Sequence, residues 1–139
     1  MGHIAGFDHL AITAADPERT MAFYRDVLGA EVLYEDKWRE GKIPVYTLQV
    51  GVNRINVHDP VRDAMIPGRL LAGTPVPGSE DFCFRWEGPI SEAVELLQRH
   101  HIPIVEGPVF RLASNNAKAT SVYFNDPDGN LVELLTTAS

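Results

Sequence analysis

Two histidines and two carboxylates, each in or beside a segment with strand character, are the residues of this chain that could do metal chemistry. His9, His58 and Glu133 come from three separate segments. Two imidazoles and one carboxylate presented by different strands form a facial ligand set for a divalent ion and leave positions open for substrate or water. Asp81 is expected to form the fourth wall of this metal site. Cys83 is the single cysteine, which excludes an internal disulfide and a cysteine-based zinc cluster, so a metal must use histidine and carboxylate.

The first half of the chain has the pattern of a strand, a helix and three further strands. Residues 7–14 alternate as a half-buried strand, with His9 on the face opposite Leu10 and Ile12. Asp16 and Pro17 then supply a helix N-cap and a proline at the first helical position, and the helix continues to Gly29. Strands are expected at residues 31–35, 45–50 and 54–58. This half is predicted to be βαβββ.

The second half repeats the same order of elements. Residues 59–79 are rich in proline and glycine and are predicted to form a structureless linker. A strand is expected at 81–86, a helix from Ile90 to about His101, and short strands at 104–105, 121–125 and 131–135. We predict one α+β domain over residues 1–139, with βαβββ modules at about 5–58 and 80–137. Their two sheets are expected to curl around one cavity.

The repeat also predicts which side chains face that cavity. Residues Phe82, Phe84 and Trp86 are bulky and apolar, so they are expected on the helix side. That leaves Asp81, Cys83 and Arg85 in the cavity, with Asp81 at the position of His9. The separations are 72 residues from His9 to Asp81 and 75 from His58 to Glu133. Both are about one repeat length, so equivalent elements are predicted to supply all four side chains.

Composition and missing motifs exclude several other classes of function. Nineteen acidic residues against twelve basic ones give a net charge of −7, which would repel a nucleic-acid backbone. No apolar stretch approaches the roughly 18 residues of a membrane span, and the first residues lack signal-peptide features, so we expect a cytoplasmic protein without a membrane partner. Nothing resembles a phosphate loop, a dinucleotide fingerprint or a nucleophile elbow. Roles other than metal binding stay open for three of these residues. His58 could form a hydrogen bond in the turn that ends its strand. Glu133 could face solvent, and Asp81 could cap the start of a strand or a loop.

Three segments resemble the vicinal oxygen chelate superfamily: residues 7–12, residues 23–29, and above all residues 122–133, Val-Tyr-Phe-Asn-Asp-Pro-Asp-Gly-Asn-Leu-Val-Glu. That superfamily includes glyoxalase I, bleomycin resistance proteins, fosfomycin-modifying enzymes and extradiol dioxygenases, and small glyoxalase-domain-containing proteins are the most similar. The resemblance implies a glyoxalase/bleomycin resistance/dihydroxybiphenyl dioxygenase-like fold. It also implies metal ligands on the first and last strands of each module, here His9, His58, Asp81 and Glu133.

The chemistry expected of such a site is that of a lyase or isomerase acting on a small oxygenated substrate. One divalent ion (zinc, nickel, manganese, cobalt or iron) would act as a Lewis acid. Glu133 is the expected base and Tyr123 the proton donor, while the substrate would be bound by Arg111, Arg85 and Asn56. The alternatives are a ferrous-iron dioxygenase and a ligand-sequestering protein without turnover. A homodimer is expected, with Tyr34, Trp38 and Tyr46 as candidate interface or pocket aromatics.

Overall fold

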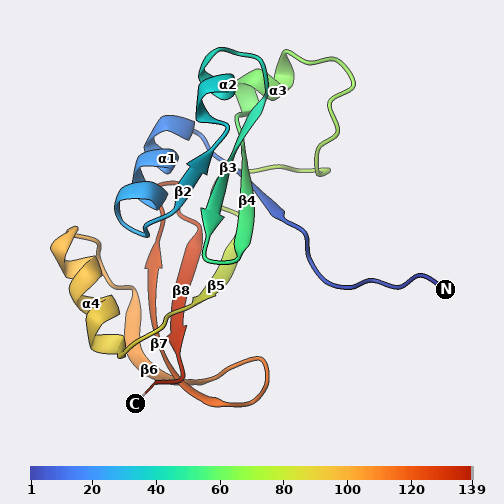
Figure 1. Ribbon diagram of the computed structural model, residues 1–139. Helices are drawn as coiled ribbons and strands as arrows, with labels where there is room; N and C mark the ends of the chain where they lie inside the picture. The colour runs from blue at the N-terminus through green and yellow to red at the C-terminus, as the bar shows by residue number, and fades with distance from the viewer. Residues whose placement is uncertain (139) are drawn as a thin grey trace. The chain divides into compact units, whose positions relative to one another are not determined.

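The chain divides into two compact units, one ending at Pro77 and the other beginning at Gly78. The computed structural model describes residues 1–138, and Ser139, the last residue of the predicted domain, lies outside the described residues. Each unit contains one four-stranded sheet with its own helices (Figure 1). Within residues 1–138, no helix is both long and apolar enough to cross a membrane.

The first unit carries the elements of the first predicted module and two additional short helices. Its sheet has the order β1-β4-β3-β2, in which β1 runs parallel to β4 and the other pairs are antiparallel. In chain order the elements are β1 (Leu10–Thr13), α1 (Pro17–Asp26), β2 (Glu31–Leu33), α2 (Glu35–Arg39), β3 (Val45–Val50), β4 (Asn53–His58) and α3 (Pro60–Ala64).

The helix α1 begins where the sequence predicts it and packs on one face of this sheet. The Asp16 carboxylate accepts a hydrogen bond from the backbone N–H of Arg19, and Pro17 is the first helical residue. The hydroxyl of Tyr46 in β3 donates to the carbonyl of Pro17 at 2.7 Å, which joins helix to sheet. The side chains buried in this unit include Ile12, Met21, Tyr24, Tyr46, Leu48, Ile55 and Val57.

The second unit repeats the arrangement with a single helix. Its sheet has the order β5-β8-β7-β6, with β5 parallel to β8. The elements are β5 (Asp81–Arg85), α4 (Ile90–Arg99), β6 (Glu106–Leu112), β7 (Lys118–Asn125) and β8 (Leu131–Thr136). The helix α4 contacts β7 and β8, and the core of this unit contains Ala93, Leu97, Val122, Phe124, Val132 and Leu134.

A polar turn between β7 and β8 fixes where β5 begins. Asn130 is fully buried; its side-chain amide donates to the Asp126 carboxylate, and its side-chain oxygen accepts the backbone N–H of Glu80 at 2.9 Å. Gly78 lies against the same turn, because a Cβ there would stand 2.4 Å from the carbonyl oxygen of Asp128. The Asp-Pro-Asp-Gly-Asn motif is therefore a structural joint that positions the strand carrying Asp81.

The two predicted βαβββ modules are confirmed, but several boundaries are corrected. The first strand begins at Leu10, so His9 precedes it. The strand expected at residues 104–105 is instead β6, which tolerates Pro108 because it is an edge strand that need not donate every N–H. The predicted linker starts with the helix α3, which Asp59 caps and Pro60 opens. Trp38 and Tyr46, expected at an interface or pocket, are buried inside the first unit.

Candidate functional site

His9 lies immediately before β1 with one ring nitrogen already engaged. Its Nδ1 is 2.8 Å from a carboxylate oxygen of Asp8, and about half of the imidazole is exposed. A carboxylate at Nδ1 fixes the ring tautomer and leaves Nε2 free, as is usual for histidines that bind metals. His9 therefore has the local arrangement that a metal ligand requires.

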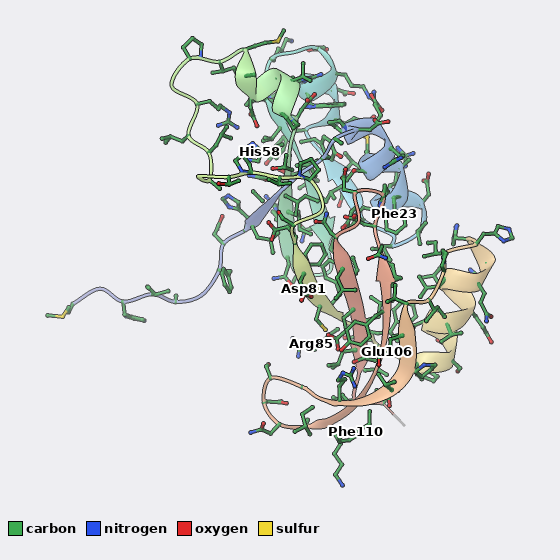
Figure 2. The ribbon with its side chains drawn as sticks, turned by 180° about the vertical axis from the view of Figure 1, so that it is seen from behind. Phe23, His58, Asp81, Arg85, Glu106 and Phe110 are labelled. Carbon is green, nitrogen blue, oxygen red and sulfur yellow. The ribbon has the colours of Figure 1, made fainter. Side chains whose placement is uncertain are left out.

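His58, at the end of β4, also has a carboxylate partner, and that partner comes from the predicted linker. Its Nδ1 lies 3.1 Å from Oδ2 of Asp63 in α3, and Arg69 donates to the other oxygen of Asp63 at 3.2 Å. The Asp63 side chain is only 5% exposed. Figure 2 shows His58 beside the segment that follows it. This contact is the structural alternative considered for His58, although sequence reasoning did not identify Asp63.

The strand register separates the two histidines that the sequence assigns to one ion. In the parallel pair β1 and β4, Leu10 is level with Ile55 and Thr13 with His58. Leu10 is thus roughly 10 Å from the level of His58 at about 3.3 Å per residue, and His9 precedes it. Two ligands of one ion need nitrogens within about 4 Å of each other, twice a metal–nitrogen bond of about 2.1 Å. The register therefore does not bring His9 and His58 to the same level of the sheet.

The second unit shows which residue of β4 is equivalent to Glu133. Glu133 is level with Cys83, two residues after Asp81. The same step from His9 leads to Ala11, which is level with Asn56. Asn56 is therefore the equivalent residue, and the count of 75 residues from His58 to Glu133 was misleading because the turns of the two modules differ in length.

Asn56 lies on the same sheet face as Thr47, its neighbour in β3. The Thr47 hydroxyl donates to the side-chain oxygen of Asn56 at 2.7 Å, and both side chains are largely buried. This bond fixes the orientation of the amide. Asn56 thus combines the predicted role in substrate binding with the position equivalent to Glu133, the expected metal ligand of the other sheet.

Glu133 lies in β8 on the polar face of the second sheet, the face opposite α4. Its carboxylate oxygen Oε2 accepts a hydrogen bond from the hydroxyl of Ser121 in β7 at 2.6 Å. Tyr123 is the residue directly opposite Glu133 across the two strands. Sequence reasoning missed Ser121, although it stands two residues before Tyr123 and therefore on the same face of the strand.

Cys83 is the neighbour of Glu133 on the other side, in β5. Partial burial raises the pKa of the Cys83 thiol to about 12, and the carboxylates of Glu133 and Asp81 add to the rise. The sulfur therefore stays protonated near neutral pH. The donors offered at this face are consequently carboxylate oxygens rather than a thiolate.

Tyr123 is tied to Arg111, one of the two arginines predicted to bind substrate. The Arg111 Nε donates to the Tyr123 hydroxyl at 2.8 Å, and another guanidinium nitrogen lies 3.2 Å from Glu106. Burial raises the pKa of Tyr123, with Glu133 adding to the rise and the bond from Arg111 opposing it. Tyr123 is accordingly a protonated hydroxyl at neutral pH, as the predicted role of proton donor requires.

The structure brings part of the predicted site together within each unit. In the second unit Glu133, Tyr123 and Arg111 share the polar face; Asp81 and Arg85 are exposed on β5, and Glu106 is on β6 (Figure 2). Residues 1–138 contain no preformed cluster of three or more His, Cys, Asp or Glu side chains. The remaining expected ligands are divided, with His9 in the first unit and Asp81 and Glu133 in the second. Imidazole and carboxylate donors of this kind fit a divalent ion.

Comparisons of this chain with family models, curated proteins and solved structures agree on one family. The family model described as Glyoxalase/Bleomycin resistance protein/Dioxygenase superfamily matches residues 6–134. Virulence protein STM3117 of Salmonella typhimurium is 35% identical over 127 residues, covering 91% of this chain and 81% of that protein. Its crystal structure superposes with a TM-score of 0.81 at 33% identity over 97% of this chain and 98% of that one.

Two further comparisons extend this likeness. A glyoxalase domain-containing protein, RDO1 of Mycosarcoma maydis, is 37% identical over 131 residues, 94% of this chain and 68% of that protein. The fold is also shared with the fosfomycin resistance protein FosX of Listeria monocytogenes, solved with Mn(II) and 1S,2S-dihydroxypropylphosphonic acid. That match has a TM-score of 0.67 at 18% identity, over 96% of this chain and 93% of that chain.

Proposed function

Because this chain belongs to the glyoxalase/bleomycin resistance protein/dioxygenase superfamily, we propose that it is a metal-dependent lyase or isomerase of the glyoxalase type, acting on a small oxygenated substrate. The observation that carries the proposal is the group on the polar face of the second sheet. There a carboxylate, Glu133, lies beside a protonated phenol, Tyr123, which an arginine holds in place. This is the combination needed to remove a proton from one atom of a substrate and to donate one to another.

The candidate ligands for the ion are His9 in the first unit and Asp81 and Glu133 in the second. His58 is left out, because the strand register places it away from the level of His9. One imidazole and two carboxylates suit manganese, iron, cobalt, nickel and zinc. The Mn(II) bound by FosX, which shares only the fold, makes manganese the first ion to test.

The bound ion would supply Lewis-acid stabilisation of negative charge on a substrate oxygen. The chain itself provides the proton transfers. A carboxylate oxygen of Glu133 accepts the proton from the carbon next to a carbonyl group. The Tyr123 hydroxyl, whose pKa is raised by burial, donates a hydrogen bond or a proton to the neighbouring oxygen. Arg111 keeps that hydroxyl in place through a bond of 2.8 Å.

The polar groups predicted to bind substrate would select it. Arg85 is exposed on β5, on the same strand face as Asp81. In the first unit, the Asn56 amide is oriented by Thr47. A compact molecule with adjacent oxygens, such as a 2-hydroxy or 2-oxo carbonyl compound, is the class that a single ion and such groups would bind.

The decisive test measures proton exchange in the substrate rather than the formation of a particular product. The protein, loaded in turn with manganese, cobalt, nickel, zinc and ferrous ions, is incubated in deuterium oxide with a panel of 2-hydroxy and 2-oxo carbonyl compounds. Proton NMR is expected to show metal-dependent exchange at the carbon next to the carbonyl of at least one compound. Glu133→Gln is expected to abolish the exchange, and His100→Ala at the end of α4 to leave it unchanged. Exchange in Glu133→Gln at the same rate as in the wild-type protein would overturn the proposal.

A further inference from the structure

Ser121 is hydrogen-bonded directly to the proposed ligand Glu133. Its side chain is completely buried, and its hydroxyl donates to Oε2 of Glu133 at 2.6 Å. A hydroxyl bound to an ionised carboxylate is among the short, strong hydrogen bonds of proteins. This bond therefore holds the Glu133 side chain in one orientation.

The bond runs diagonally across two strands rather than between directly opposed residues. Ser121 is level with Leu135, and Glu133 is level with Tyr123. The carboxylate is thus bordered by Ser121 on one side and by Tyr123 on the other, and Arg111 fixes Tyr123 in turn. Because both flanks are fixed, the carboxylate has little freedom to rotate.

We propose that Ser121 is the positioning residue of the metal site: by occupying Oε2, it limits Glu133 to binding the ion through Oε1. The inference rests on the proposed function, in which Glu133 is a ligand. Binding through one oxygen leaves an additional position on the ion for an oxygen of the substrate. It would also keep Oε2 attached to the protein while the carboxylate accepts a proton.

A fixed carboxylate also binds an ion more tightly than a mobile one, because its rotational freedom is already lost before binding. Loss of a hydrogen-bond partner behind a metal ligand typically lowers metal affinity about 10- to 100-fold. Ser121→Ala is therefore expected to weaken Mn²⁺ binding by at least about 10-fold. Ser121→Thr keeps the hydroxyl and is expected to stay within a few-fold of the wild type.

The test is titration calorimetry with manganese chloride, together with the visible absorption of the cobalt form. A carboxylate released by Ser121→Ala can bind through both oxygens, which raises the coordination number and weakens the cobalt d–d bands. Ser114→Ala, at an exposed serine between β6 and β7, is the matched control and is expected to change neither measurement. Thermal melting of every variant verifies that it is folded.

The outcomes separate this inference from the proposed function. Weaker binding and a changed cobalt spectrum in Ser121→Ala, with both properties retained in Ser121→Thr, support the role of Ser121. Wild-type affinity and an unchanged spectrum in Ser121→Ala overturn it and leave the proposed function standing. A wild-type protein that binds neither manganese nor cobalt overturns both.

Discussion

At the scale of single residues, Glu133 influences the ionisation of the groups around it. The pKa values of both Cys83 and Tyr123 are raised chiefly by burial, and Glu133 adds to the rise in each case. Negative charge next to a thiol or a phenol disfavours its ionised form. On the polar face of the second sheet, the neutral Tyr123 hydroxyl and Cys83 thiol therefore border the Glu133 carboxylate.

This coupling predicts the reactivity of Cys83. With a pKa of about 12, only about one thiol in ten thousand is ionised at pH 8, and thiolate is the form that reacts with iodoacetamide. Glu133→Gln removes a negative charge, lowers the thiol pKa and is expected to speed alkylation several-fold. Mass spectrometry of timed samples measures the rate. Glu106→Gln, which removes a partner of Arg111, is the control; an unchanged rate in Glu133→Gln would refute the coupling.

The corrected register predicts different results for the two histidines. His9→Ala removes a proposed ligand and is expected to lower Mn²⁺ affinity at least about 100-fold, more than the loss of a supporting residue. His58→Ala is expected to change that affinity less than about threefold, because the strand register sets His58 away from the level of His9. Titration calorimetry distinguishes the two. Equal losses in both variants would restore His58 as a ligand and contradict the register argument.

At the scale of elements, the segment after β4 is attached to the first unit by two polar contacts. Asp63 joins His58 to Arg69, and the guanidinium of Arg62 lies 4.2 Å from the centre of the Trp38 ring and donates to the Trp38 carbonyl. Both contacts involve residues from α3 or just after it. This part of the predicted linker is therefore an ordered continuation of the first unit.

Removal of the Asp63 carboxylate is expected to release this segment. Asp63→Ala leaves Arg69 and His58 without their shared partner, at a cost of about 2 kcal/mol in the free energy of unfolding. Urea denaturation measures that loss. Limited proteolysis is expected to cut faster between residues 65 and 77. Asp36→Ala, at an exposed acid in α2, provides the comparison, and equal stability and cleavage in both variants would contradict the attachment.

The elements also show why the sequence predicted the fold better than the site. Alternating and helical patterns depend on neighbouring residues, so both βαβββ modules were predictable from Ile12, Tyr24, Val122 and similar core residues. The relation of His9 to Asn56 depends on how β1 pairs with β4, and no local pattern contains that register. The bond between Ser121 and Glu133 was hidden for the same reason, since it joins two strands diagonally.

At the scale of the whole molecule, the edge strand β6 is the most exposed apolar feature of the second unit. Phe110 is 63% and Leu112 56% exposed, and β6 has a strand neighbour on only one side. Figure 2 marks Phe110 on this strand. An unprotected edge with apolar side chains favours pairing with another chain.

We therefore keep the prediction of a homodimer and place the contact at β6. Light scattering at micromolar concentration is expected to give twice the chain mass. Phe110→Asp puts a charge into the contact and is expected to give a monomer, whereas Val52→Asp, at an exposed residue between β3 and β4, is expected to stay dimeric. A wild-type protein with the mass of a single chain would contradict the prediction of a homodimer.

The central claim is that Glu133 is a ligand of one divalent ion. Crystals grown with manganese chloride and measured near the manganese absorption edge test it most directly, because the anomalous signal locates the ion itself. The account predicts one strong peak per chain, within bonding distance of Glu133 Oε1, with Ser121 still bound to Oε2. A peak away from Glu133, or no peak in crystals of a folded protein saturated with manganese, would contradict it.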